Sequence, residues 1–324
     1  MASYTVTRAA NGQVIVSFKD MEKHNVKGVG TMTGDATFAV GTTGESDESV
    51  FQVGNDAESA NLEFSADKTT DNFEFNGENI DAEFKNESEQ AYNVQWNAKN
   101  SKFDSSASNS SLIFVAGEES SNNLITIGDN TNNTSGFDNI VSDSGKNNAY
   151  VAQGKSSNVF ETTAESVGAL IQGSNAHNEF YLSGSYGVFS GGSADDLFVT
   201  DAASGEYNVM LGNAGSDRII DYGSHSLFAG GAGYDYTKIL GEYGVFNLGF
   251  GEEGYVEYGS SADHSAAFTA ETSKPDKNGK VYTYSEVLAM NQFELEAFLE
   301  TSGLKDNPYL NLVLNGLKEA FNQQ

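Results

Sequence analysis

The sequence contains no cysteine, only two prolines and few basic residues, and these shortages exclude several classes of protein. Without cysteine the chain has no disulfides, no thiolate metal sites and no thiol nucleophile. The 17 Lys and Arg residues are outnumbered by 46 Asp and Glu residues, which gives a formal net charge of -29. Nucleic acids and anionic membranes bind cationic surfaces, so neither is an expected partner. No apolar run approaches the roughly 18 to 20 residues of a spanning helix, so we do not expect membrane insertion.

Signatures of catalysis are also missing from the sequence. The four histidines (His24, His177, His225 and His264) are scattered, and there is no H-E-x-x-H, G-x-S-x-G or phosphate-binding loop. Polysaccharide lyases and epimerases, which some repeat folds carry, need cations to neutralise a uronate, and this chain has two arginines, Arg8 and Arg218. We therefore predict that the protein is not an enzyme.

Aromatic residues and glycine are abundant, and they recur in a short phrase. With 21 Phe and 15 Tyr the chain is too aromatic for a disordered acidic protein. Four early copies of the phrase alternate polar and apolar residues, as a half-buried strand does. They read NLEF from Asn61, NFEF from Asn72, DAEF from Asp81 and NVQW from Asn93, and their final aromatics lie 11, 9 and 12 residues apart. Gly, Asn, Ser and Asp fill the stretches between, and these residues form tight turns.

A repeat of about ten residues, strand then turn, predicts an all-β fold, a parallel β-solenoid or β-roll. In a solenoid, each strand stacks on the equivalent strand of the next coil, and two units form a coil of about 20 residues. An antiparallel sandwich of short hairpins also has turns every 8 to 12 residues. The regular recurrence of one phrase favours the solenoid, because a sandwich does not require it.

The second half of the chain contains a more specific, glycine-rich phrase. Its copies read GGSADDLF from Gly191, GNAGSDRI from Gly212 and GGAGYDYT from Gly230, and a degenerate copy starts at Gly173. The phrase resembles the nonapeptide G-G-x-G-x-D-x-U-x of the RTX (repeats-in-toxin) family. The starts are 18, 21 and 18 residues apart, and 18 is the length of an RTX coil of two nonapeptides.

The resemblance to RTX proteins implies a calcium-binding β-roll. Calcium prefers about six hard oxygen ligands in a flexible geometry, which glycine turns and one aspartate per turn can supply. The implied side-chain ligands are Asp196, Asp217 and Asp235, with Asp195, Asp138 and Asn178 as further candidates, and the implied carbonyl ligands belong to Gly191, Gly192, Gly212, Gly215, Gly230 and Gly233. The same residues are also compatible with ordinary Gly/Asp turns that bind no metal.

The intervening half-coils lack the aspartate, so calcium is expected along one edge of the solenoid only. At the equivalent positions they carry Tyr186, Tyr207, His225 and Tyr243. We predict that these side chains cap the opposite edge.

The two ends of the chain differ from the repeat region. We expect an N-terminal strand or capping segment at 1–35, the solenoid at 36–273 and a C-terminal helical cap at 274–324. The last segment has apolar residues at helical spacing after Ser285 and again after Pro308. A cap would protect the open edge of a solenoid, and RTX proteins use an uncleaved C-terminal signal for type I secretion. Both roles are compatible with this segment.

These observations predict a structural role outside the cell. We expect a secreted, calcium-stabilised β-solenoid that associates with itself, through its ends and termini, into a filament, surface layer or matrix. The N-terminus has neither a cationic leader nor an apolar stretch, so an N-terminal secretory signal is not expected. The alternative is an adhesin or another repeat module that binds a cell-surface glycan.

Overall fold

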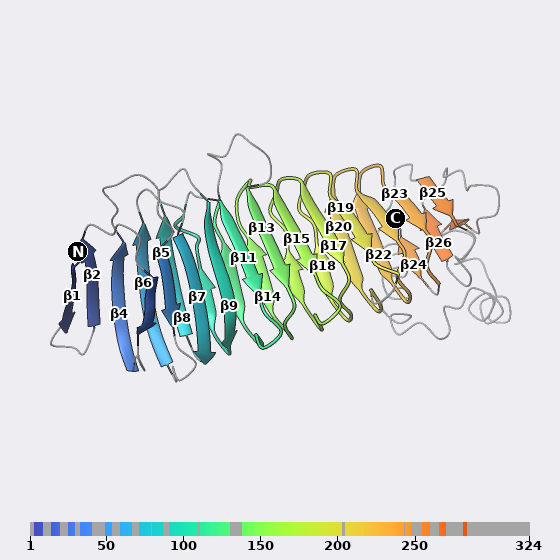
Figure 1. Ribbon diagram of the computed structural model, residues 1–324. Helices are drawn as coiled ribbons and strands as arrows, with labels where there is room; N and C mark the ends of the chain where they lie inside the picture. Colours follow the sequence, from blue (N-terminus) through green and yellow to red (C-terminus); the bar gives the residue numbers. More distant parts are fainter. Residues whose placement is uncertain are drawn as a thin grey trace. The chain divides into compact units, whose positions relative to one another are not determined.

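The computed structural model shows an all-β chain whose strands follow one another as the rungs of a solenoid (Figure 1). The structure describes residues 3–8, 14–19, 25–29, 33–40, 49–53, 59–66, 71–78, 80–86, 91–108, 111–129, 138–202, 205–242, 244–247, 255–259, 266–269 and 281–283. Among these residues there is no helix, and hence none long and apolar enough to cross a membrane. The predicted helices after Ser285 lie outside the described residues.

The chain divides into two compact units, Met1–Ala176 and His177–Gln324. In each unit the even-numbered strands form one sheet and the odd-numbered strands the other, except that β1 and β27 join the even-strand sheets.

The first unit contains nine strands in its even-strand sheet and seven in its odd-strand sheet among the described residues. The even-strand sheet has the order β1 (Ser3–Arg8), β2 (Val14–Lys19), β4 (Thr33–Val40), β6 (Ser59–Ala66), β8 (Ile80–Asn86), β10 (Lys102–Asp104), β12 (Leu124–Ile127), β14 (Ala149–Ala152) and β16 (Leu170–Gln172). The odd-strand sheet has the order β3 (Asn25–Val29), β5 (Ser49–Val53), β7 (Asp71–Glu78), β9 (Tyr92–Lys99), β11 (Leu112–Ala116), β13 (Asn139–Asp143) and β15 (Asn158–Thr162).

The second unit repeats this arrangement with fewer rungs. Its even-strand sheet has the order β18 (Val188–Ser190), β20 (Val209–Ala214), β22 (Leu227–Ala232), β24 (Val245–Asn247), β26 (Ala266–Thr269) and β27 (Val281–Thr283). Its odd-strand sheet has the order β17 (Asn178–Leu182), β19 (Leu197–Thr200), β21 (Arg218–Asp221), β23 (Tyr236–Ile239) and β25 (Tyr255–Tyr258).

Parallel pairing confirms the predicted solenoid and excludes the antiparallel sandwich. Within the described parts of each unit, neighbouring strands pair in parallel and in register, as in Phe114 opposite Val141 and Phe198 opposite Ile219. The exceptions are the hairpin of β1 and β2, which is antiparallel, and a register shift between Val26 and Val29 in the pairing of β3 with β5. In the first unit parallel pairing begins between β2 and β4, and in the second it reaches β27, so parallel strands occur beyond the predicted limits of 36 and 273.

The recurring aromatic and aliphatic residues form the core between the two sheets of each unit. In the first unit Phe84, Trp96, Phe103 and Phe114 are fully buried, with neighbouring ring centroids 4.8 to 5.9 Å apart. In the second unit Phe180 and Phe198 are stacked at 4.6 Å with an interplanar angle of 5°. Alternation along each strand places these rings inside and the residues between them on the outer faces. The rungs also bring equivalent turns together, which creates the candidate site.

Candidate metal site

Four polar residues of the second unit form a column at the start of the odd-numbered strands. Glu179 lies opposite Leu197, Leu197 opposite Arg218, and Arg218 opposite Tyr236. The residues just before these four therefore occupy successive rungs, about 4.8 Å apart. They are Asn178, Asp196, Asp217 and Asp235, which we call the carboxylate column, and all are at most 2% exposed.

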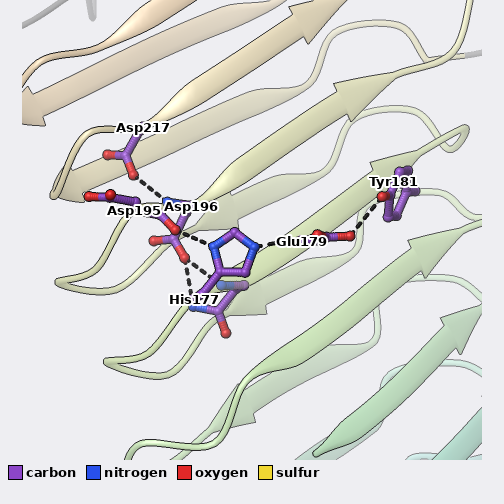
Figure 2. Close-up of polar contacts among 7 residues, drawn as sticks. His177, Glu179, Tyr181, Asp195, Asp196 and Asp217 are labelled. Carbon is purple, nitrogen blue, oxygen red and sulfur yellow. Dashed lines mark hydrogen bonds and ion pairs between the residues drawn. The ribbon is translucent and has the colours of Figure 1, made fainter. Parts of the chain in front are cut away.

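Backbone hydrogen bonds hold one oxygen of each carboxylate in place. Asn178 N–H donates to Asp196 Oδ1 at 2.7 Å, Asp196 N–H to Asp217 Oδ1 at 2.8 Å, and Asp217 N–H to Asp235 Oδ1 at 3.0 Å. Figure 2 shows the bond between Asp196 and Asp217. Each rung thus receives a hydrogen-bond acceptor from the next, which fixes the register of the turns.

The first unit fills the same position with asparagine. Leu112 N–H donates to Asn139 Oδ1 at 3.1 Å, and Asn139 Nδ2 donates to Asn158 Oδ1 at 2.9 Å. A neutral amide satisfies the same backbone donor without burying a charge. The hydrogen-bonding role therefore does not require a carboxylate, and the aspartates of the second unit need a further explanation.

The second oxygen of each aspartate lies over the first glycine of its own turn. A Cβ placed on Gly212 would lie 2.1 Å from Asp217 Oδ2 and 2.4 Å from the carbonyl oxygen of Gly230, so both oxygens face the same point. Gly191 has the same relation to Asp196 Oδ2 and the Gly212 carbonyl, at 2.3 and 2.9 Å. Only glycine leaves this space open, which explains the first glycine of each phrase.

Asp217 Oδ2 is one of the buried acceptors that the described structure leaves unsatisfied. It has no hydrogen-bond partner, whereas Asp196 Oδ2 accepts the Gly192 N–H at 2.7 Å. Two oxygens, Asp217 Oδ2 and Gly230 O, therefore face one point with no donor between them. Such an arrangement is stable when the acid is protonated or when a cation lies between the oxygens.

The pKa values reflect this environment. The pKa of Asp217 is raised to about 8, chiefly by burial and also by the negative charges of Asp196, Asp235 and Asp195, while the hydrogen bond from the Asp196 N–H opposes the shift. Burial also raises the pKa of Asp196, although hydrogen bonds from Gly192 and Asn178 oppose the shift. Without a cation the column therefore retains protons at pH values where an exposed aspartate has lost its own.

The donor set of the column fits a hard cation such as calcium. Carboxylate and carbonyl oxygens are the ligands that calcium prefers, and they face common points on successive rungs. No group of three or more His, Asp or Glu side chains among the described residues could hold a metal ion by itself. A cation here would take its remaining ligands from backbone carbonyls and water.

The other predicted ligands occupy different positions. Asp195 is exposed, its Oδ1 accepts the Ser216 N–H at 2.6 Å, and its carbonyl oxygen contacts His177 Nδ1 (Figure 2). Gly215 and Gly233 adopt φ angles of 121° and 132°, which favour glycine. In the first unit Asn139, rather than the predicted Asp138, occupies the position equivalent to the column, and Asp138 Oδ2 accepts the Ser157 N–H at 2.9 Å.

Sequence reasoning missed a further buried aspartate of the second unit, Asp221 at the end of β21. Its Oδ1 accepts hydrogen bonds from Thr200 Oγ1 at 2.6 Å and Ser226 Oγ at 2.8 Å, but its buried Oδ2 has no hydrogen-bond partner. Burial raises the pKa of Asp221 to about 6. The available signal was an Asp two residues before a glycine, Asp221 before Gly223, but this spacing is common in ordinary turns.

Asp143 in the first unit has the same spacing, before Gly145, and is fully satisfied. Its Oδ1 accepts hydrogen bonds from Asn148 Nδ2 at 2.8 Å and Tyr150 OH at 2.6 Å, and its Oδ2 accepts one from Ser166 Oγ at 2.5 Å. The two aspartates thus differ in the donors around them.

The opposite edge of the second unit carries the aromatic residues expected there. Tyr186 and Tyr207 are stacked with ring centroids 5.0 Å apart, and Tyr207 and His225 with centroids 4.4 Å apart. All three have φ angles between 57° and 61°, a left-handed conformation that costs about 1 kcal/mol for such residues. Stacking offsets part of this cost. Tyr243 lies outside the described residues.

Comparison of the chain with protein-family models, curated proteins and solved structures finds no match. The resemblance to RTX proteins therefore rests on the glycine-rich turns and their aspartates.

Proposed function

We propose that this protein is a structural β-solenoid, stabilised by calcium, that is secreted and associates with itself into an extracellular filament, surface layer or matrix. The observation that carries the proposal is the carboxylate column. There the buried Asp217 Oδ2, which has no hydrogen-bond partner, and the Gly230 carbonyl oxygen face the same point above Gly212. A protein without a cation has to protonate this column or tolerate buried negative charge.

Calcium would supply the positive charge that the described part of the second unit otherwise lacks at this column. The cations of its described residues, Arg218 and Lys238, lie on the outer face of the odd-strand sheet, where Arg218 stacks on Tyr236 at 5.1 Å and Lys238 pairs with Glu257 at 2.9 Å. Neither is engaged with the column. Binding a divalent ion there would couple folding of the second unit to the free calcium concentration.

This coupling suits a protein that is exported before it folds. Calcium is scarce in the cytoplasm and about millimolar outside many cells, and extracellular calcium modules bind with dissociation constants of about 0.1 to 1 mM. The chain would remain export-competent inside the cell and would become ordered outside it. The formal charge of -29 would at the same time oppose association until cations reduce the repulsion.

Calcium titration of the purified, chelator-treated protein at pH 8 tests the proposal. We expect calcium to raise both the folded fraction, measured by circular dichroism, and the sedimentation coefficient, and we expect EGTA to reverse the first effect. Sodium chloride at matched ionic strength is the control for general screening. Identical folded fractions and sedimentation coefficients in calcium and in EGTA would reject the proposal.

A surface- or glycan-binding module is the second candidate. It is favoured by exposed tyrosines on the second unit, Tyr181, Tyr222 and Tyr234, which are 39 to 47% exposed. Negative-stain images distinguish the two candidates, because regular polymers support the structural role and dispersed particles that bind a surface support the second.

A further inference from the structure

Three polar side chains share the outer face of the odd-strand sheet at the start of the second unit. His177 directly precedes β17, and Glu179 and Tyr181 follow at every second position of the strand. The residues between them, Asn178 and Phe180, are fully buried. Alternation therefore brings the imidazole, the carboxylate and the phenol side by side, just outside the first rung of the carboxylate column (Figure 2).

The imidazole of His177 lies between two oxygen atoms. Its Nδ1 contacts the carbonyl oxygen of Asp195 on the next rung, and its Nε2 lies 3.4 Å from Glu179 Oε1 (Figure 2). Because a carbonyl oxygen can only accept a hydrogen bond, the contact with Asp195 places a hydrogen on Nδ1. In the neutral imidazole the lone pair is then on Nε2, where it faces the carboxylate.

The distance between Nε2 and Oε1 suits a bridging metal ion better than a shared proton. Hydrogen bonds between a charged nitrogen donor and a carboxylate measure about 2.7 to 2.9 Å, whereas these two atoms are 3.4 Å apart. Zinc forms bonds of about 2.0 to 2.2 Å to histidine nitrogen and carboxylate oxygen. An ion at those distances from both atoms would have an N–Zn–O angle of about 110°, which is close to the tetrahedral angle that zinc adopts.

The groups around the two atoms also match the surroundings of zinc ligands. A histidine that binds zinc usually donates its other N–H to a carbonyl or carboxylate, and a carboxylate ligand usually accepts a further hydrogen bond. The Asp195 carbonyl fills the first role, and Tyr181 OH, which donates to Glu179 Oε2 at 2.7 Å, fills the second. Opposite Glu179 and Tyr181 on the next rung lie the uncharged Leu197 and Val199. Both ligand side chains are thus oriented before an ion binds.

We propose that His177 Nε2 and Glu179 Oε1 bind a zinc ion, with water at its remaining two positions. The two side chains are 45% and 21% exposed, so an ion and its water molecules can reach them. Imidazole nitrogen is a ligand for zinc and its neighbours among the transition metals, whereas calcium prefers oxygen. The zinc site therefore differs from the carboxylate column in its ligands and its metal, and it goes beyond the proposed function.

Protection of His177 from acylation by diethyl pyrocarbonate tests the zinc site residue by residue. The reagent attacks an unprotonated imidazole nitrogen, so an ion on Nε2 should block it. We expect zinc chloride to slow modification of His177 by at least about tenfold, measured by mass spectrometry of peptides. His225 of the same unit, whose Nδ1 contacts Ser224 Oγ at 3.2 Å, is the internal control, and we expect its modification rate to be unchanged. Excess calcium in every sample competes with zinc for the carboxylate column.

Two variants test the roles of the carboxylate and the phenol. Glu179→Gln keeps the shape of the side chain and its ability to accept from Tyr181, and we expect it to lower the affinity for zinc at least about tenfold. Tyr181→Phe removes an outer hydrogen bond, and we expect a loss of about tenfold. Glu206→Gln is the matched control, because it removes one charge from an exposed acid of the same unit, and we expect wild-type affinity. Circular dichroism should be the same for all of these proteins.

The outcomes distinguish the zinc site from a simple ion pair and from the proposed function. If zinc leaves the acylation of His177 unchanged, the residues form an imidazolium–carboxylate pair only, and the inference is wrong. Protection of Glu179→Gln at the same zinc concentrations as the wild type would also overturn it. If zinc protects His177 while calcium changes neither folding nor sedimentation, the zinc site stands and the proposed function falls.

Discussion

Asp217 combines three properties that ordinary turn aspartates do not share. It is 1% exposed, one of its oxygens has no hydrogen-bond partner, and burial raises its pKa to about 8. In the first unit asparagines occupy the equivalent positions, and Asn139 accepts the same kind of backbone hydrogen bond, from the Leu112 N–H, without a charge. The difference between the two units therefore lies in the charge of the column rather than in its hydrogen bonds.

Replacing Asp217 by asparagine should separate these roles. In EGTA at pH 8, we expect Asp217→Asn to raise the free energy of unfolding by about 1 to 3 kcal/mol, because the amide can donate toward the Gly230 carbonyl and leaves no buried acceptor unsatisfied. We expect calcium to stabilise this variant much less than the wild type. Thermal unfolding with and without calcium measures both effects.

Asp195→Asn is the matched control for this substitution. It changes an exposed aspartate of the preceding turn, beside Asp196, and we expect its melting temperature and calcium response to remain close to those of the wild type. A lower stability of Asp217→Asn in EGTA, by an amount equal to its loss in calcium, would show that the carboxylate serves hydrogen bonding alone.

Comparing Asp221 with Asp143 tests how a missing hydrogen-bond donor affects a buried carboxylate. The pKa of Asp221 is raised to about 6, so the stability that its protonated form contributes is complete below about pH 4 and is lost as the pH rises through 6. We therefore expect Asp221→Asn to stabilise the protein by about 1 kcal/mol at pH 7.5, and to have a smaller effect at pH 4.5.

Asp143 accepts three side-chain hydrogen bonds, so we expect Asp143→Asn to destabilise the protein by about 1 to 3 kcal/mol.

Denaturant unfolding at the two pH values measures these changes. Equal effects of the Asp221 and Asp143 substitutions, in sign and size, would contradict this account of the two sites.

The residues of the column could be predicted because a motif repeats around them at nearly constant spacing. Asp196, Asp217 and Asp235 each stand two residues before an inward residue, and the register places them on consecutive rungs. The sequence also indicated Asp138, but the position equivalent to the column is the next residue, Asn139. Ile140 and Val141 are both β-branched and apolar, so the pattern does not indicate which of them faces inward, and a shift of one residue exchanges the two faces of a strand.

The strands themselves could be predicted with more certainty than their ends. Alternation of aromatic and polar residues indicated the strands of both units, and repetition of the phrase indicated parallel stacking. The hairpin of β1 and β2 and the late strand β27 carry no such phrase. Parallel pairing was therefore expected to start too late, at 36 instead of Val14, and to end too early, at 273 instead of Thr283. Local sequence does not determine which strand closes a sheet, because pairing partners are distant in sequence.

The turn before β21 requires glycine at position 212, because a side chain there would fill the space that two oxygens face. We expect Gly212→Ala to destabilise the second unit by about 1 to 3 kcal/mol and to reduce its affinity for calcium, because the new Cβ would lie 2.1 Å from Asp217 Oδ2 and 2.4 Å from the Gly230 carbonyl oxygen. Thermal unfolding and calorimetric calcium titration measure the two effects.

Ala232→Ser is the control, because Ala232 is exposed in the equivalent region of the next turn, and we expect a change of no more than about 0.5 kcal/mol. If Gly212→Ala had the stability and the calcium affinity of the wild type, no cation would bind at the point above this glycine.

At the scale of the whole molecule, the two units share one kind of rung but differ in the charge of their turns. The first unit uses asparagine at the position of the column, whereas the second uses aspartate in three consecutive rungs. We therefore expect calcium to act on the second unit and to leave the turns of the first largely unaffected. A uniform response would indicate general screening of the charge of -29 rather than binding at the column.

Hydrogen–deuterium exchange with and without calcium, at pH 8 and matched ionic strength, tests this central claim most directly. The amides of Asn178, Asp196 and Asp217 donate to the column, so their exchange reports on its order. We expect calcium to slow exchange in peptides covering residues 191–239 by at least about tenfold, and to leave peptides covering 139–162 nearly unchanged. Equal exchange in calcium and EGTA, or equal slowing in both regions, would contradict a cation bound at the carboxylate column.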